Sequence, residues 1–446
     1  MSVVRPTAPE AVLWIARTLE GAGFDTWAVG GAIRDAVLGR ASGDWDLATR
    51  ARPRDVRRLF KRTVPIGVEH GTVGVLARDG TMFEVTTFRK DVETDGRHAV
   101  VEFADAIDDD LARRDFTINA IAWHPLRNEL HDPFDGAGDL DRGVLRTVGV
   151  AADRFREDYL RVLRAIRFAG RFGLEIEADT WSALRSVVDR LPNLSPERIR
   201  DELLKILGAD PSPGRALEMC SESGVLRVLF SELEELRDAT TVRDRPSAPD
   251  APPAPDVWAS TLAVVDRLPL GRPYLKLAAL LRPLPGDQVA AFLLRLRLSN
   301  ANTDEVARLA DAAPLPEAGE PDAAYRRWLS RHGGHRLNAV ARLDLATARA
   351  ESERGGGAPS RCATVVEAWR RGREIRAGNP PLRVADLAID GRGLVRLGLR
   401  PGPRFGEILD ALLDWVLDDP ARNEPGALEA RALEMERRAS AGASDG

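Results

Sequence analysis

The sequence predicts an α+β protein with a mixed sheet near the N-terminus and an all-α remainder. Two observations support this prediction. Over roughly the first 125 residues, short apolar stretches with strand-like alternation are interspersed with helical patterns. Beyond about residue 150 the strand patterns vanish, and apolar residues recur at helical spacing. We therefore expect a mixed N-terminal domain followed by helical domains.

The composition excludes several classes of protein. A chain of 446 residues, 44% of them hydrophobic, is long enough for roughly two to four domains with their own cores. Only two cysteines, Cys220 and Cys362, exclude a disulfide framework or a cysteine-based zinc cluster. No apolar run resembles a secretory signal or approaches membrane-spanning length, so we expect a cytoplasmic protein without a membrane partner. The net charge of −5 still permits RNA binding, because phosphates need only a local basic face.

The N-terminal elements follow from local patterns. Helices are expected over residues 9–20, 32–38 and 53–62, the last beginning with a proline. Strands are expected over residues 26–29, 45–48, 72–76 and 82–88. Asp79-Gly80 joins the last two strands and is a favoured hairpin turn. Residues 89–101 are polar and are predicted to form a mobile loop, and residues 246–255 a linker.

The segment Gly30-Gly31 is predicted to form a turn that can hold a phosphate. Glycines let the backbone approach a phosphate closely, and the N-terminus of the following helix favours an anion. Arg34 lies one turn into that helix and can reach a phosphate oxygen or a ribose. A plain tight turn between strand and helix is the alternative interpretation. No Gly-x-x-x-x-Gly-Lys-Ser/Thr segment occurs, which argues against a P-loop ATPase.

Two aspartates follow this turn at a spacing that suits metal binding. Asp44 and Asp46 stand at i and i+2, so in a strand their side chains leave on one face. Joining a nucleoside triphosphate to a 3′-hydroxyl needs neutralised charge and a more acidic hydroxyl, and carboxylate-bound Mg²⁺ does both. Glu84, on the predicted strand 82–88, is a weaker candidate for a third carboxylate. A solvated turn is the alternative, but the neighbouring Gly-Gly turn favours catalysis.

Three further segments carry a family resemblance. Residues 113–120 read Arg-Arg-Asp-Phe-Thr-Ile-Asn-Ala, residues 157–161 read Glu-Asp-Tyr-Leu-Arg, and residues 197–207 read Glu-Arg-Ile-Arg-Asp-Glu-Leu-Leu-Lys-Ile-Leu. Together with the Gly-Gly segment, in this order, they resemble the class II tRNA nucleotidyltransferases, the CCA-adding enzymes, and their poly(A) polymerase relatives. The resemblance implies a nucleotidyltransferase head (1–145) and helical neck (146–210), body (211–350) and tail (351–446) domains.

The resemblance also implies roles for individual residues. Mg²⁺ would be bound by Asp44 and Asp46. The triphosphate and sugar would be bound at Gly30, Gly31, Arg34 and Arg114, with Arg113 and Asp115 as structural or sugar-side partners. The base would be read by Asp158 and Arg161, with Arg164 and Arg167 close by.

Base reading also has a chemical rationale. Cytosine and adenine each present an amine donor beside a ring-nitrogen acceptor, which match a carboxylate and a guanidinium. Asp158 and Arg161, at i and i+3, would lie side by side on a helix, and Arg164 and Arg167 would continue a basic stripe. Uracil and guanine present the reverse pattern, and each unpaired group costs about 1–3 kcal/mol. An ion-paired helix surface is the alternative interpretation.

The expected function is completion or repair of the 3′-terminal CCA of tRNA from CTP and ATP. Enzymes of the family that add only CC look shortened after the strand ending at Phe88, whereas residues 94–98 (Thr-Asp-Gly-Arg-His) are retained here. Addition of the terminal A alone, or polyadenylation of RNA, is the second interpretation. A non-catalytic RNA-binding protein with a relic head is the third. The sequence gives no signal of oligomeric state.

The C-terminal half departs from many relatives, which carry a phosphohydrolase domain marked by His and His-Asp pairs. No histidine lies between residues 132 and 331, so the HD-like body is expected to be degenerate and without hydrolase activity. The Asp390-Gly391 segment and residues 397–403 resemble the C-terminal motif of bacterial members. Arg400 in that motif is a weaker candidate for contact with RNA phosphates.

Overall fold

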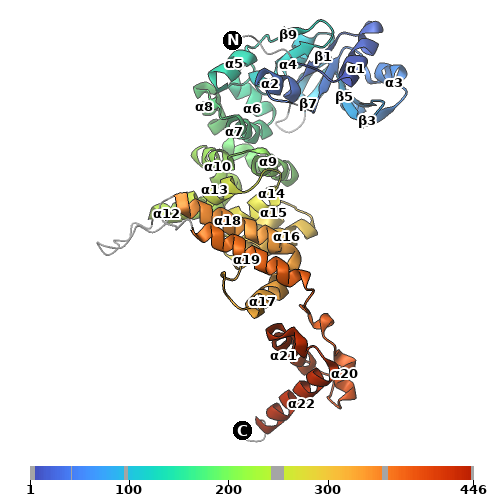
Figure 1. Ribbon diagram of the computed structural model, residues 1–446. Helices are drawn as coiled ribbons and strands as arrows, with labels where there is room; N and C mark the ends of the chain where they lie inside the picture. Colours follow the sequence, from blue (N-terminus) through green and yellow to red (C-terminus); the bar gives the residue numbers. More distant parts are fainter. Residues whose placement is uncertain (1–5, 42, 95–98, 243–255, 354–359, 443–446) are drawn as a thin grey trace. The chain divides into compact units, whose positions relative to one another are not determined.

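The computed structural model describes residues 6–41, 43–94, 99–242, 256–353 and 360–442 (Figure 1). The chain divides into two compact units. The first comprises residues 1–238 with 295–297, and the second comprises residues 239–294 and 298–446. None of the helices within the described ranges is both long enough and apolar enough to cross a membrane.

A seven-stranded mixed sheet forms the N-terminal part of the first unit. Its strands run in the order β3-β4-β5-β2-β1-β8-β9, and β2 and β5 are the parallel pair while the other neighbours are antiparallel. The strands are β1 Thr26–Val29, β2 Asp46–Thr49, β3 Thr63–Gly67, β4 Thr72–Leu76, β5 Met82–Thr87, β8 Ala122–His124 and β9 Glu129–His131. The helical elements are α1 Glu10–Gly21, α2 Gly31–Val37, α3 Pro53–Leu59, α4 Ile107–Ala112, α5 Gly136–Arg142, η1 Val68–His70 and η2 Thr117–Asn119.

The two faces of this sheet differ in character. Leu47, Val85 and Val73 are cross-strand partners on β2, β5 and β4, and all three are completely buried. The adjacent row consists of Asp46, Glu84 and Gly74, which are likewise partners on the same strands. Because successive side chains of a strand point to opposite faces, these two rows project from opposite sides of the sheet. The sheet thus holds two carboxylates on the face opposite its apolar core.

Helices follow the sheet in the first unit. They are α6 Ala151–Glu157, α7 Leu160–Phe172, α8 Ala178–Ser186, α9 Pro196–Ala209, α10 Pro213–Glu222, α11 Val225–Leu229, α12 Ser231–Val242 and the 3₁₀ segment η3 Val188–Asn193. Helix α7 packs against α9 and α10. Phe168 of α7 meets Phe116 edge-on, with ring centroids 5.8 Å apart, which joins this helix to the sheet domain.

The second unit is helical throughout its described residues. Its elements are α13 Val257–Arg267, α14 Pro273–Leu281, α15 Gly286–Arg295, α16 Asn300–Ala310, α17 Asp322–His332, α18 Leu337–Glu353, α19 Ser360–Ala377, α20 Gly391–Arg396, α21 Arg404–Asp418, α22 Pro425–Gly442, η4 Gly334–Arg336, η5 Val384–Asp386 and η6 Pro420–Arg422. Leu394, Leu412, Val416 and Leu428 are fully buried and form a core shared by α20, α21 and α22.

The structure corrects three expectations about the fold. Residues 89–101 were expected to be a mobile loop, but β6 (Arg89–Thr94) and β7 (Ala99–Phe103) form an antiparallel pair supported by an ion pair between Lys90 and Glu102. Strand β3 was missed because Pro65 and a bulge interrupt its pattern. A short parallel pair, β10 (Val144–Leu145) with β11 (Glu175–Ile176), places one strand beyond residue 150. Residues 95–98 and the predicted linker 246–255 lie outside the described residues, and the four-domain division stays a prediction.

Candidate active site

A cavity of about 610 Å³ opens on the carboxylate-bearing face of the sheet, within the first unit. Its volume falls in the range of ligand sites. All the predicted site residues except Asp44 and Arg400 line it: Gly30, Gly31, Arg34, Asp46, Glu84, Arg114, Asp158, Arg161, Arg164 and Arg167. Residues predicted from separate segments of the sequence therefore meet in one cavity.

Two carboxylates, Asp46 and Glu84, line one side of this cavity, and the charge of Asp44 acts on Asp46 from outside the lining. Asp46, at the start of β2, is the direct cross-strand partner of Glu84 on β5. Asp44 precedes the strand and is exposed, so it does not share the strand as expected. Burial, followed by the negative charges of Asp44 and Glu84, raises the pKa of Asp46 to about 6. Carboxylate oxygens are the ligands that hard divalent cations prefer, and a bound cation would neutralise this concentration of negative charge around Asp46.

The spacing of these acids bears on how a cation would fit. Within the described part of the chain, their carboxylate oxygens do not form a set in which all three lie within 4.8 Å of one another. The three acids therefore do not form one compact ligand set in this structure. Asp44 differs from Asp46 and Glu84 in being exposed and outside the regular strands.

The Gly-Gly turn lies beside the acids. Gly30 has φ 75°, a left-handed conformation that side chains disfavour, and it caps α2. A Cβ atom at Gly30 would lie 3.7 Å from Asp46 Oδ2 and 3.5 Å from Arg114 Nη1. The turn, the acid and the arginine thus surround one small volume of the cavity.

Arg34 is held on several sides. Its Nη1 donates to Asn119 Oδ1 at 2.8 Å, and its Nε and Nη2 donate to Asp35 Oδ1 at 3.0 and 2.8 Å. The guanidinium carbon stands 4.4 Å from the ring centroid of Phe172, a cation–π contact. Burial is the main reason that the pKa of Arg34 is lowered, although it remains far above neutrality. Arg34 is therefore a charged group with a fixed orientation.

Asp115 links the sheet domain to α7. Its Oδ1 accepts from Asn119 Nδ2 at 2.9 Å, and its Oδ2 accepts from Arg164 Nε at 2.7 Å. Burial alone would raise the pKa of Asp115, but the charge of Arg164 and these hydrogen bonds hold it below the usual value. A chain of hydrogen bonds thus runs from Arg164 through Asp115 and Asn119 to Arg34.

Asp158 and Arg161 line the cavity together, but not from one helix as expected. Helix α6 ends at Glu157, Asp158 is extended with φ −154°, and α7 begins at Leu160. The Asp158 carboxylate accepts from Leu160 N at 3.0 Å and from Arg198 Nη2 at 2.7 Å. A local side-chain bond of this kind competes with the helix, which explains the break.

Arg161 is positioned by a carboxylate and by backbone oxygens. Its Nη1 donates to Glu157 Oε2 at 2.5 Å and to the Arg154 carbonyl at 3.0 Å, and its Nη2 donates to the Arg113 carbonyl at 3.2 Å. A guanidinium has five N–H groups and a carboxylate about four acceptor sites. Both Arg161 and Asp158 therefore keep capacity for a ligand.

Arg164 and Arg167 differ from the open basic stripe that was expected. Arg164 is paired with Asp115, as described above. Arg167 is buried, and its Nε donates to Glu202 Oε2 at 2.6 Å. Glu202 is itself 1% exposed and also pairs with Lys205. The two arginines reach the cavity wall as members of ion pairs.

Comparisons with known proteins place this arrangement in a family. Residues 26–146 match the family described as "Poly A polymerase head domain", and residues 173–236 match "Probable RNA and SrmB- binding site of polymerase A". The CCA-adding enzyme of Geobacillus kaustophilus is 34% identical over 435 residues, which are 96% of this chain and 97% of the relative. The chain belongs to the CCA-adding enzyme family.

Solved structures of CCA-adding enzymes share the fold. The Bacillus stearothermophilus enzyme, in complex with CTP, has 30% sequence identity and a TM-score of 0.76, covering 98% of this chain and 100% of that one. The Thermotoga maritima enzyme, complexed with tRNA, has 21% identity and a TM-score of 0.57, covering 97% of each chain. The second likeness concerns the fold alone.

Several cavity residues of this CCA-adding family member were not singled out from the sequence. Asn119 and Asp110 stand in or beside the Arg-Arg-Asp segment, and Arg198 stands in the segment 197–207. Asp110 accepts from Arg113 Nε at 3.1 Å and from Arg114 Nη2 at 2.9 Å. The i, i+3 and i, i+4 spacing of Asp110 with these arginines is the sequence signal that could have identified this role.

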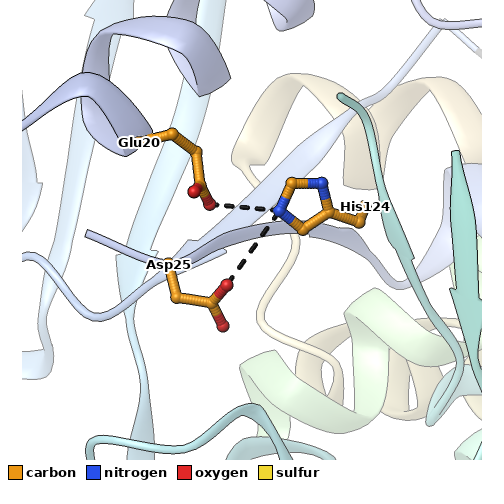
Figure 2. Close-up of side chains that lie close together, drawn as sticks. All are labelled: Glu20, Asp25 and His124. Atoms are coloured by element: carbon orange, nitrogen blue, oxygen red, sulfur yellow. Dashed lines mark hydrogen bonds and ion pairs between the residues drawn. The ribbon is translucent and has the colours of Figure 1, made fainter. Parts of the chain in front are cut away.

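A second acid-rich group in the head lies outside the cavity lining. The described residues contain one group of three His, Cys, Asp or Glu side chains whose ligand atoms are mutually within 4.8 Å: Glu20, Asp25 and His124. Figure 2 shows both carboxylates directed at His124 Nε2, at 3.1 Å for Glu20 and 4.0 Å for Asp25. The Arg127 backbone N–H donates to His124 Nδ1 at 3.1 Å, so Nε2 carries the ring hydrogen and donates to Glu20.

The hydrogen bonds of Glu20, Asp25 and His124 explain why these side chains lie close together without a bound metal. A cation on Nε2 would move the ring hydrogen to Nδ1, where it would face the Arg127 N–H. Glu20 also accepts from Thr26 N at 2.7 Å, and Asp25 accepts from Trp27 Nε1 at 2.7 Å. The group ties α1, β1 and β8 together.

Arg400 lies apart from these residues in the chain. It is exposed in the loop between α20 and α21 of the second unit. Its neighbour Arg404 is engaged with Glu436 at 2.8 Å. Contact of Arg400 with RNA stays a prediction.

Proposed function

We propose that the chain is a Mg²⁺-dependent, template-independent nucleotidyltransferase that completes or repairs the 3′-terminal CCA of tRNA from CTP and ATP. One observation carries this proposal. The carboxylates Asp46 and Glu84 share a single cavity with Asp158 and Arg161, which have the donor and acceptor groups to read a base. Membership of the CCA-adding enzyme family supports the same substrates.

The acids are the proposed metal ligands. Asp44 and Asp46 would hold Mg²⁺, with Glu84 as a third carboxylate beside them. Bound Mg²⁺ would neutralise charge on the triphosphate and make the attacking 3′-hydroxyl more acidic. The raised pKa of Asp46, to about 6, fits a site whose negative charge is not yet balanced. No separate protein base is required.

The Gly-Gly turn and two arginines are the proposed triphosphate and sugar site. The backbone at Gly30 and Gly31 can approach a phosphate without a side chain in the way. Arg34 and Arg114 reach the same cavity and supply positive charge, and both are fixed by bonds to Asn119. Because the two guanidinium groups are already held in place, they can orient a triphosphate without rearranging when the triphosphate binds.

Asp158 and Arg161 are the proposed readers of the base. The carboxylate accepts from the amine of cytosine or adenine, and the guanidinium donates to the adjacent ring nitrogen. With uracil or guanine, the carboxylate would face a carbonyl and the guanidinium would face an N–H group. Each group left unpaired would cost about 1–3 kcal/mol of binding free energy. Their supports, Arg198 and Glu157, hold the two side chains in place. Arg164 and Arg167 complete the wall of the site.

One assay separates this function from its alternatives. The protein is incubated with tRNA lacking its 3′ end and with CTP alone, ATP alone or both. Incorporation of C twice and then A once supports the proposal. Extension of unrelated RNA by ATP alone supports a poly(A) polymerase, and RNA binding without transfer supports a non-catalytic protein. We expect this activity to take place in the cytoplasm.

A further inference from the structure

An exposed apolar surface continues the carboxylate face of the sheet. The row that begins with Asp46 and Glu84 runs on through Gly74 of β4 to Val64 of β3. Cross-strand partners project to the same face, so Val64 lies on the side of the acids. Its exposed fraction is 36%, which is high for valine in a sheet.

Two more side chains complete this surface. A Cβ atom placed on Gly74 would lie 2.8 Å from Ile66 Cδ1 and 2.9 Å from Met82 Sδ, so these side chains converge over the glycine. Ile66 is 42% exposed and Met82 47% exposed. We call Val64, Ile66 and Met82 the apolar platform. Gly74 lets the platform form, because a larger residue would push both side chains away.

We propose that the apolar platform binds the nucleobase of the 3′-terminal nucleotide of the acceptor RNA. The inference rests on the proposed function and names a part of its substrate site. Along the sheet, the Gly-Gly turn follows β1, the acids lie on β2 and β5, and the platform residues lie on β3 and at the start of β5, on either side of Gly74 of β4. The acids thus separate the proposed triphosphate site from the platform.

The chemistry of transfer favours this occupant. In phosphoryl and nucleotidyl transfer, the attacking and leaving oxygens lie roughly in line on opposite sides of the phosphorus. With the leaving pyrophosphate at the Gly-Gly turn, the attacking 3′-oxygen arrives from the platform side of the acids. A base attached to that ribose would then lie over Ile66 and Met82, which offer an apolar surface without hydrogen-bond selection. This suits an acceptor end whose last base changes during addition.

Charge at the border of the platform agrees with an RNA partner. Lys61 and Arg62 directly precede β3, and both are exposed. Arg89 reaches the cavity from the end of the neighbouring hairpin and donates to the His70 carbonyl at 2.6 Å. An apolar surface bordered by cations is the arrangement that single-stranded RNA recognises.

A mutant cycle tests the proposal with the full-length protein. The platform variant is Ile66→Ser with Met82→Ser, and the matched control is Leu126→Ser, an exposed leucine (39%) in the β8–β9 turn at the other end of the sheet. The wild-type protein and both variants are assayed for AMP transfer to tRNA that lacks its terminal A. This tRNA ends either in a normal C or in an abasic ribose at the same position. We expect the platform variant to raise the KM for normal tRNA about tenfold, with the KM for ATP within about twofold.

The abasic end provides the decisive comparison. Replacing the terminal C by an abasic ribose should raise the KM for tRNA about tenfold in the wild-type protein and in Leu126→Ser. In the platform variant, the abasic ribose should raise this KM no further. Two kinetic results would overturn the proposal. One is a platform variant with an unchanged KM for normal tRNA, and the other is a platform variant whose KM the abasic ribose raises by as large a factor as in the wild-type protein. A changed oligomeric state with unchanged RNA affinity would also overturn it, and would assign the surface to self-association. If no protein transfers AMP, the proposed function fails, and the same cycle measured by fluorescence anisotropy of RNA binding decides the inference separately.

Discussion

Asp46 and Glu84 are direct partners across the parallel strands β2 and β5, so both carboxylates leave the sheet on one face. They stand 38 positions apart in the sequence, and pairing of the strands alone brings them together. Two paired strands of the sheet, β2 and β5, therefore hold the proposed metal ligands in place. This arrangement also has a measurable cost, because burial, followed by the neighbouring negative charges, opposes the ionisation of Asp46.

The first prediction concerns this cost. The folded chain raises the pKa of Asp46 from 3.8 to about 6, so ionised Asp46 destabilises the metal-free fold above pH 6 and not below about pH 4. Asp46→Asn should therefore stabilise the metal-free protein at pH 8, by about 3 kcal/mol, and lose this advantage at pH 4. Thermal unfolding at both pH values measures the difference. An equal shift at both values would contradict the origin of the raised pKa.

The second prediction concerns base choice. Arg161→Ala removes the proposed donor to the ring nitrogen, and we expect discrimination against UTP to fall about tenfold or more. Competition between CTP and UTP on tRNA lacking its 3′ end measures the ratio. Arg156→Ala is the matched control, because Arg156 lies on α6 and is 67% exposed beside Asp153. Unchanged selectivity in Arg161→Ala would remove Arg161 from the proposed base site.

The third prediction concerns Asn119, which bonds both Arg34 and Asp115. Asn119→Ala leaves Arg34 Nη1 and Asp115 Oδ1 without this partner. We expect the KM for nucleoside triphosphates to rise about tenfold and unfolding to become easier by about 1–3 kcal/mol. Steady-state kinetics and urea unfolding give the two values. A loss of stability with an unchanged KM would show that Asn119 supports the fold and does not position Arg34.

The fourth prediction concerns the buried pair of Arg167 and Glu202. Glu202→Ala leaves the Arg167 charge buried without its partner and should cost about 3–5 kcal/mol. The double variant Arg167→Met with Glu202→Leu removes both charges and should recover most of this loss. Urea unfolding of the three proteins tests the comparison. A double variant as unstable as the single one would show that packing, and not the charge, dominates at this site.

Much of the fold could be predicted because its signals are local. Strands β1 and β4 have the predicted bounds, β5 ends one residue before its predicted end, and both ends of α1 lie one residue later than predicted. Strand β3 could not be predicted in the same way, since Pro65 and the bulge break its alternation. The hairpin of β6 and β7 carries polar residues, and its pairing depends on a partner strand that local patterns do not reveal.

The candidate site likewise has parts that could be predicted from the sequence and parts that could not. The Gly-Gly turn and the acids are short motifs with a mechanism, so they could be recognised from sequence. The bond from Arg34 to Asn119 spans 85 residues, and no local pattern predicts it. The break at Asp158 arises because its carboxylate accepts from the Leu160 N–H, whereas helical spacing with Arg161 suggested a continuous helix.

We infer that Asp46 anchors a metal-dependent transfer of C and A to a tRNA end. The most direct test is single-turnover transfer from CTP and ATP to tRNA lacking its 3′ end, with Mg²⁺, by the wild-type protein and by Asp46→Asn. We predict that the wild-type protein adds C twice and A once, and that Asp46→Asn binds the tRNA but transfers at least about a thousandfold more slowly. Transfer by Asp46→Asn within tenfold of the wild-type rate would contradict the account.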